Sequence, residues 1–106
     1  MADAYKTLYQ GQLPASVAVI ATVGVAKSWI IKHIDIVNTG GTELTFQLFR
    51  NGTTSPFAIT PSGWTVLGGG KCEFDGSIAL AAGETIAGVA GAATTVNVII
   101  DGDEVS

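Results

Sequence analysis

The sequence has few charged residues, which limits the partners that it can recognise. Charged side chains make up 13% of the 106 residues, against about 25% in ordinary soluble domains. Nine acidic and five basic residues leave a net charge of −4. The basic residues are scattered, which argues against binding of nucleic acid. A surface with so little charge suits a chain that is partly covered by its own copies or by another protein.

The side chains used in catalysis are also scarce. A single cysteine, Cys72, excludes an internal disulfide, and it shares a strand face with Phe74, which favours a buried thiol. His33 and Asp35 point the same way from one strand, as an acid–base pair or two metal ligands would. A third ligand at a useful spacing is missing, and no predicted helix N-terminus activates Cys72 as a partner of His33. We therefore expect no enzyme activity, no cofactor and no metal.

Targeting and membrane-spanning segments are lacking as well. The start of the sequence, MADAYK, has no positively charged region followed by an apolar stretch. The most apolar run, Ala15 to Ala26, is too short to cross a bilayer as a helix. We expect a protein that is made in the cytoplasm and has no membrane partner.

An alternating pattern of apolar and polar residues fills the second half of the chain. Between Lys71 and Val105 the pattern is that of strand, turn, strand, turn and strand. Phe74, Ile78 and Leu80 lie on one face of the first of these strands. Its other face carries acidic and polar side chains, at Glu73, Asp75 and Ser77. Alternation of this kind predicts strands with one buried face.

The first half of the chain also indicates strands, and helical spacing is absent from the sequence. The strongest, Ser28 to Asn38, mixes apolar and polar residues on both faces, which predicts either a β-bulge or a strand that is partly covered on both sides. Glu43 to Arg50 follows, with Phe49 expected to face outward. The further expected strands are Tyr5 to Gln10 at an edge, Ser16 to Val23, and a short one near Trp64 to Leu67.

The fold class that these patterns predict is all-β. We expect residues 1–106 to form a single β-sandwich of about eight antiparallel strands, jelly-roll-like in arrangement. Residues 1–14 are expected to form an extended N-terminal arm, and residues 101–106 a polar tail that frays. Asp101, Asp103 and Glu104 resemble half of a calcium loop without the full pattern, so a solvated tail is preferred to an intersubunit cation site.

Four aromatic residues are candidates for contact with a partner. Phe57 and Trp64 lie in the least regular segment, Thr53 to Gly70, where an aromatic side chain serves either as core or as an anchor on a partner. Tyr5 and Tyr9 lie on one side of the expected edge strand. The glycine run that ends this segment lacks the GKS or GKT ending and the following helix of a phosphate-binding loop, so a flexible turn is preferred.

Several segments together resemble a known group of proteins. They read YQGQLP from Tyr9, WIIKHIDIVNTGG from Trp29, a strand ending in RNG at Arg50, LAAGETIAG from Leu80, and VNVIIDGDE from Val96. The set is similar to small β-sandwich virion proteins of tailed bacteriophages, and the similarity covers roughly Tyr9 to Glu104. This family is structural and contributes no catalytic motif.

The resemblance implies a capsid decoration (cement) protein that binds the outer surface of the phage head and stabilises it. Its partners would be the major capsid protein and its own copies, often as trimers, and its location the virion. The alternative is a tail- or fibre-associated module that binds a receptor glycan, with Trp64 and Phe57 stacking on sugars. Since sandwiches serve both roles, the fold alone does not choose between them.

Overall fold

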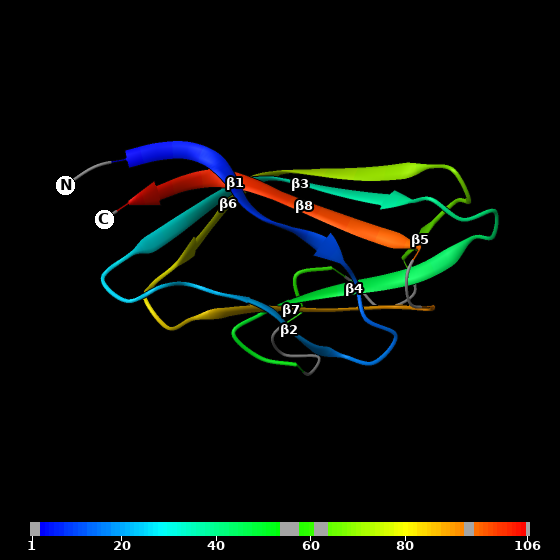
Figure 1. The fold of residues 1–106 in the computed structure, drawn as a ribbon, viewed down its shortest axis with the longest axis horizontal. Helices are drawn as coiled ribbons and strands as arrows, with labels where there is room; N and C mark the ends of the chain where they lie inside the picture. The colour runs from blue at the N-terminus through cyan, green and yellow to red at the C-terminus, as the bar shows by residue number, and fades with distance from the viewer. Residues whose placement is uncertain (1–2, 54–57, 61–63, 93–94, 106) are drawn as a thin grey trace.

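The computed structural model describes residues 3–53, 58–60, 64–92 and 95–105. Within them the chain forms two layers of strands in a body measuring 44 × 25 × 21 Å (Figure 1). In the described part, no helix is long and apolar enough to cross a membrane. The strands are β1 (Asp3–Gln12), β2 (Ala18–Thr22), β3 (Ser28–Asn38), β4 (Leu44–Arg50), β5 (Thr65–Val66), β6 (Lys71–Leu80), β7 (Thr85–Ala90) and β8 (Val96–Val105).

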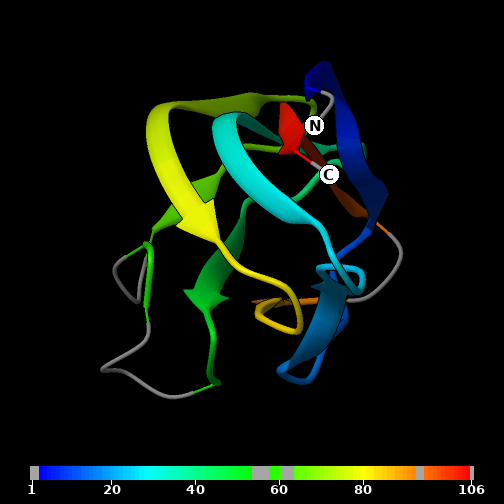
Figure 2. The ribbon, with the colours of Figure 1, turned by 90° about the vertical axis from the view of Figure 1, so that its left-hand side faces the viewer.

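The strands of both sheets pair in one nested order. The first sheet has the order β1-β8-β3-β6 and the second the order β2-β7-β4-β5. Every pair is antiparallel, and the first strand pairs with the last, the second with the seventh, the third with the sixth and the fourth with the fifth. Figure 2 shows the two layers from one end. The predicted all-β sandwich of about eight antiparallel strands is confirmed, and the jelly-roll-like arrangement stays a prediction.

A β-bulge in β3 explains its mixed alternation. The register of β3 shifts between Ile31 and His33 against both of its neighbours, β6 and β8. Before the bulge the odd-numbered Trp29 and Ile31 are buried, and after it the even-numbered Ile34 and Ile36 are buried. The predicted bulge is confirmed. It places the polar side chains that follow it on the face of the first sheet that points away from the core.

The core lies between the sheets and is built from both. Among the residues that the structure describes, fifteen buried ones form it: Leu13, Val23, Trp29, Ile31, Ile34, Ile36, Phe46, Leu48, Val66, Leu80, Ile86, Ala90, Val96, Val98 and Ile100. Most are β-branched or aromatic, the types that fit a pleated sheet. Phe49, which was expected to face outward, lies outside this core cluster, but it is not exposed, because only 4% of the residue is accessible. It forms a β-bridge with Ala58, where the chain returns beside β4.

The expected arm and tail are both strands of the first sheet. β1 is an edge strand, as expected for Tyr5 to Gln10, and it pairs with β8 along its length. The prediction of a fraying polar tail is wrong for residues 101–105, because they continue β8 between β1 and β3. Ser106 lies outside the described residues. An extended strand also separates the carboxylates that resembled half of a calcium loop.

Glu104 shows how this end of β8 is held. Its Oε2 accepts a hydrogen bond of 3.0 Å from Trp29 Nε1, and its Oε1 lies 3.0 Å from Lys6 Nζ. The hydrogen bond from Trp29, followed by that from Lys6, lowers the pKa of the Glu104 carboxyl below its usual value. The carboxylate of Glu104 therefore accepts hydrogen bonds from side chains on β1 and β3 and does not depend on solvent alone.

Candidate functional site

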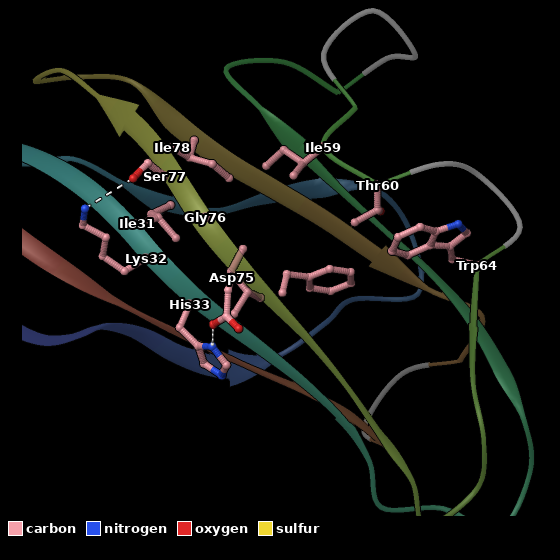
Figure 3. Close-up of a pocket in the computed structure, with 12 residues that line it drawn as sticks. Ile31, Lys32, His33, Ile59, Thr60, Trp64, Asp75, Gly76, Ser77 and Ile78 are labelled. Carbon is pink, nitrogen blue, oxygen red and sulfur yellow. Dashed lines mark hydrogen bonds and ion pairs between the residues drawn. The ribbon is translucent and has the colours of Figure 1, made fainter.

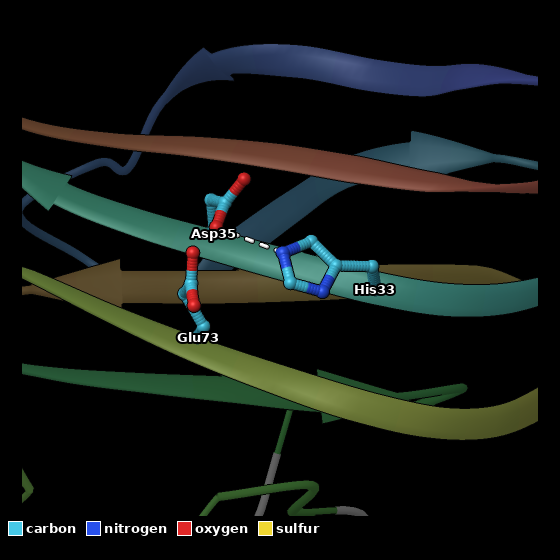
Figure 4. A group of neighbouring side chains, drawn as sticks. All are labelled: His33, Asp35 and Glu73. Atoms are coloured by element: carbon cyan, nitrogen blue, oxygen red, sulfur yellow. Dashed lines mark hydrogen bonds and ion pairs between the residues drawn. The ribbon is translucent and has the colours of Figure 1, made fainter.

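A histidine and three carboxylates gather on the outer face of the first sheet. The pairing of β3 with β6 sets Asp35 opposite Glu73 and His33 opposite Asp75. His33 Nε2 lies 2.9 Å from Asp35 Oδ1, and His33 Nδ1 lies 2.5 Å from Asp75 Oδ1. Figure 4 shows His33, Asp35 and Glu73 projecting from the two adjacent strands. We call His33, Asp35, Glu73 and Asp75 the His33 cluster.

Two positively charged groups, His33 and the neighbouring Lys71, lie among the carboxylates of the His33 cluster. The hydrogen bonds to Asp75 and then to Asp35 raise the pKa of His33 to about 9, so the imidazole is protonated at neutral pH and donates from both nitrogens. Lys71 Nζ lies 2.8 Å from Glu73 Oε1 and 4.0 Å from Asp35 Oδ1. The hydrogen bond to Glu73 raises the pKa of Lys71 above its usual value. Three carboxylates thus face two cations, which leaves a net charge of −1.

The cluster extends the pair that the sequence indicated. His33 and Asp35 were expected to point the same way, and they do. Glu73 and Asp75 supply the further carboxylates that seemed to be missing, since they lie across the strand pair and not at a short spacing in the sequence. Their alternation on β6 was visible in the sequence. The register that sets them opposite β3 was not.

Cys72 takes no part in this cluster. It pairs with Ile36, whose side chain is fully buried, and it packs against the core on the face opposite to His33. Its thiol is partly buried and lies 3.7 Å from the carbonyl oxygen of Thr65. The structure therefore does not bring Cys72 and His33 together as a nucleophile and base.

An open cleft lies beside the cluster, between β6 and the chain before β5. Its volume is about 290 Å³. Trp64, which is 44% exposed, stacks on Phe74 with ring centroids 5.4 Å apart and an interplanar angle of 13°. Asp75 and Ser77 line the same cleft, and Lys32 Nζ donates a hydrogen bond of 3.3 Å to Ser77 Oγ (Figure 3). An aromatic platform with polar groups around it can take a flat ligand that carries hydroxyl groups.

The four candidate interface residues do not form one surface. Tyr5 is 65% exposed on β1, whereas Tyr9 on the same strand packs partly against the core. Trp64 contacts β6, the opposite edge of the first sheet. Phe57 lies outside the described residues.

Sequence reasoning missed further exposed apolar side chains. They are Val17, Val19, Val25 and Leu67. The three valines fall within the uncharged run from Ala15 to Ala26, which was the signal for this surface. The run was compared only with the length that a membrane-spanning helix needs. It was not considered as the exposed edge of a sheet.

Of the comparisons with known proteins, the one with solved structures finds a likeness of fold. No protein-family profile matches the sequence, and no curated protein matches it. A solved structure described as "Bacillus endospore appendages form a novel family of disulfide-linked pili" aligns with 98% of this chain and 88% of its own chain, at 15% identity and a TM-score of 0.47. A likeness at this level carries no argument about function, so the resemblance to phage virion proteins stays a prediction.

Proposed function

We propose that the chain is a structural virion protein, a capsid decoration protein that binds the outer surface of a phage head and stabilises it. It acts by binding its own copies and the major capsid protein, many times over one shell. Multivalent binding lets weak single contacts add up to stable attachment. The low charge of the sequence and the segments that resemble virion proteins support this proposal.

The observation that carries the proposal is the apolar edge at β2. Val17 is 44% exposed, Val19 51% and Val25 93%, and no charged residue lies between Ala15 and Ala26. Among the described residues β2 pairs with β7 alone, so one side of its backbone faces outward. An exposed apolar edge strand is a template for pairing with another chain. Burying apolar surface there contributes roughly 25 cal/mol per Å².

The substitution Val19→Lys tests this surface. A lysine on β2 should prevent close packing of a second chain, so we expect the variant to be monomeric by light scattering where the unmodified chain associates. We also expect its affinity for phage shells that lack the protein to fall at least about a hundredfold, because a buried unpaired charge costs several kcal/mol and each 1.4 kcal/mol is roughly a factor of ten. Unfolding curves establish that the variant remains folded.

The matched control is Thr7→Lys, which adds the same charge at an exposed position on β1, the edge strand of the other sheet. We expect it to associate and to bind shells as the unmodified chain does. An unmodified chain that stays monomeric and shows no affinity for such shells would refute the proposal.

A second candidate function is binding of a receptor glycan by a tail- or fibre-associated module. The exposed Trp64 ring, stacked on Phe74 in the open cleft, favours it, because apolar sugar faces stack on such rings. We expect Trp64→Ala to abolish binding on a glycan array, and Leu67→Ala, an exposed residue that does not line the cleft, to leave it unchanged. Silence of the unmodified chain on the array would count against this candidate.

A further inference from the structure

We propose that His33, Asp35 and Glu73 form a binding site for a divalent transition-metal ion of the zinc class, on the outer face of the first sheet. One ligand atom from each residue lies within 4.8 Å of the others. One imidazole nitrogen and two carboxylate oxygens form a mixed donor set that suits Zn²⁺ better than Mg²⁺ or Ca²⁺, which take oxygen ligands. This inference does not depend on the function proposed above.

The distances are close to those that one ion requires. Ligands about 2.0–2.2 Å from a common zinc ion lie roughly 3–4 Å from each other. His33 Nε2 and Asp35 Oδ1, at 2.9 Å, already have nearly this separation. Glu73 projects from the neighbouring strand directly opposite Asp35, and its side chain is 49% exposed, so it has room to turn its carboxylate toward the ion. From His33 to Val37, β3 pairs with β6 without a further register shift, which fixes where the ligands start.

Asp75 orients the imidazole for this role. Its Oδ1 accepts a hydrogen bond of 2.5 Å from His33 Nδ1–H across the strand pair, and Nε2 is the nitrogen that faces Asp35. Histidines that bind metal ions usually donate their other N–H to a carboxylate in this way, which fixes the ring and strengthens the ligand. Asp75 is thus a positioning residue outside the ligand set.

A cation already sits beside the proposed ligands. Lys71 Nζ lies 2.8 Å from Glu73 Oε1 and 4.0 Å from Asp35 Oδ1, and its side chain is 53% exposed. A metal ion would replace this ammonium group, which swings into solvent. The proton between His33 Nε2 and Asp35 Oδ1 leaves to solvent, and the nitrogen lone pair then binds the ion. Three protein ligands leave at least one position for water or for a group from another chain.

The test is titration of ZnCl₂ into the purified, tag-free chain, followed by calorimetry and by thermal unfolding. We expect one ion per chain and a melting temperature that rises with zinc concentration, since an ion that binds only the folded state stabilises it. Co²⁺ should give the visible absorption of a nitrogen- and oxygen-ligated ion without a thiolate charge-transfer band. Mg²⁺ at equal concentration should give neither effect.

Variants separate this site from scattered binding to surface carboxylates. His33→Gln, Asp35→Asn and Glu73→Gln should each abolish the stoichiometric heat, and Asp75→Asn should weaken binding about tenfold. Asp103→Asn, on the same sheet, and Cys72→Ser should bind as the unmodified chain does. Lys71→Gln should bind about fivefold tighter, because it removes a positive charge that competes with the ion for Glu73 and Asp35.

The Lys71 variant keeps the test decisive even where a ligand variant folds poorly. A merely structural role for the His33 cluster predicts no gain in zinc affinity when Lys71 is removed. Zinc binding that is unchanged in His33→Gln, or absent from the unmodified chain at millimolar zinc, would overturn the proposal.

Discussion

Replacing Gly102 with alanine is expected to lower the free energy of unfolding by about 3 kcal/mol, as overpacking of a closed site does. A Cβ atom at this position would lie 2.1 Å from the carbonyl oxygen of Ile30 and 2.9 Å from Cα of Ile31. Both are backbone atoms of β3, held next to its bulge, so they have no rotamer by which to move away. Gly102 also pairs with Lys6 on the other side, which keeps β8 from shifting as a whole.

The matched control for this substitution is Gly76→Ala on β6, the edge strand of the same sheet. A Cβ at Gly76 meets nothing within 4 Å, so we expect a change within about 0.5 kcal/mol. Both variants can be compared by urea unfolding monitored through tryptophan fluorescence. Equal stability of the two would contradict the close approach of β3 to β8.

The substitution Asn38→Ala is expected to cost a similar amount, about 3 kcal/mol. Asn38 is fully buried, and its Nδ2 donates to the carbonyl oxygens of Thr42, at 2.7 Å, and Val66, at 3.2 Å. Its Oδ1 accepts from the amide of Gly40 at 3.0 Å. One side chain thus joins the end of β3 to the turn that follows and to β5. Each buried group left without a partner costs about 1–3 kcal/mol.

Thr39→Ala is the control for this position. It removes a hydrogen bond of 3.1 Å from the exposed Thr39 hydroxyl to the carbonyl oxygen of Thr95, and we expect it to cost less than about 1 kcal/mol. Differential scanning calorimetry of both variants checks the difference. If Asn38→Ala melts at the same temperature as Thr39→Ala, the buried network contributes little.

The alternation of apolar and polar residues predicted the strands, but not which other segments of the chain pack against them or pair with them. The mixed faces of Ser28 to Asn38 were enough to predict the bulge. A bulge exchanges the buried and exposed positions within one strand, so the change can be read from the residues of that strand alone. Phe49 was placed outside by the same reasoning, which does not include the return of the chain at Ala58. Residues 101–105 looked like a free tail because their polar groups find partners on β1 and β3, far away in the sequence.

The His33 cluster likewise has one part that the sequence predicts and one part that it does not. The pair on β3 follows from the period of two along a single strand. The contribution of Glu73 and Asp75 depends on the register between β3 and β6, which a sequence pattern does not specify. Asn38 was predicted only as the last residue of a strand, since nothing in the sequence shows that its amide lies between two carbonyl groups.

The nested pairing of the strands also has a consequence for folding during synthesis. β8 lies between β1 and β3, yet it leaves the ribosome after the other seven strands. Until it arrives, β1 has no neighbour in its sheet, and the contact between Asp3 and Val105 must close a loop that spans almost the whole chain. Pairings so distant in sequence slow folding and leave strand edges exposed meanwhile. The nascent chain is therefore most in need of protection just before its last strand is complete.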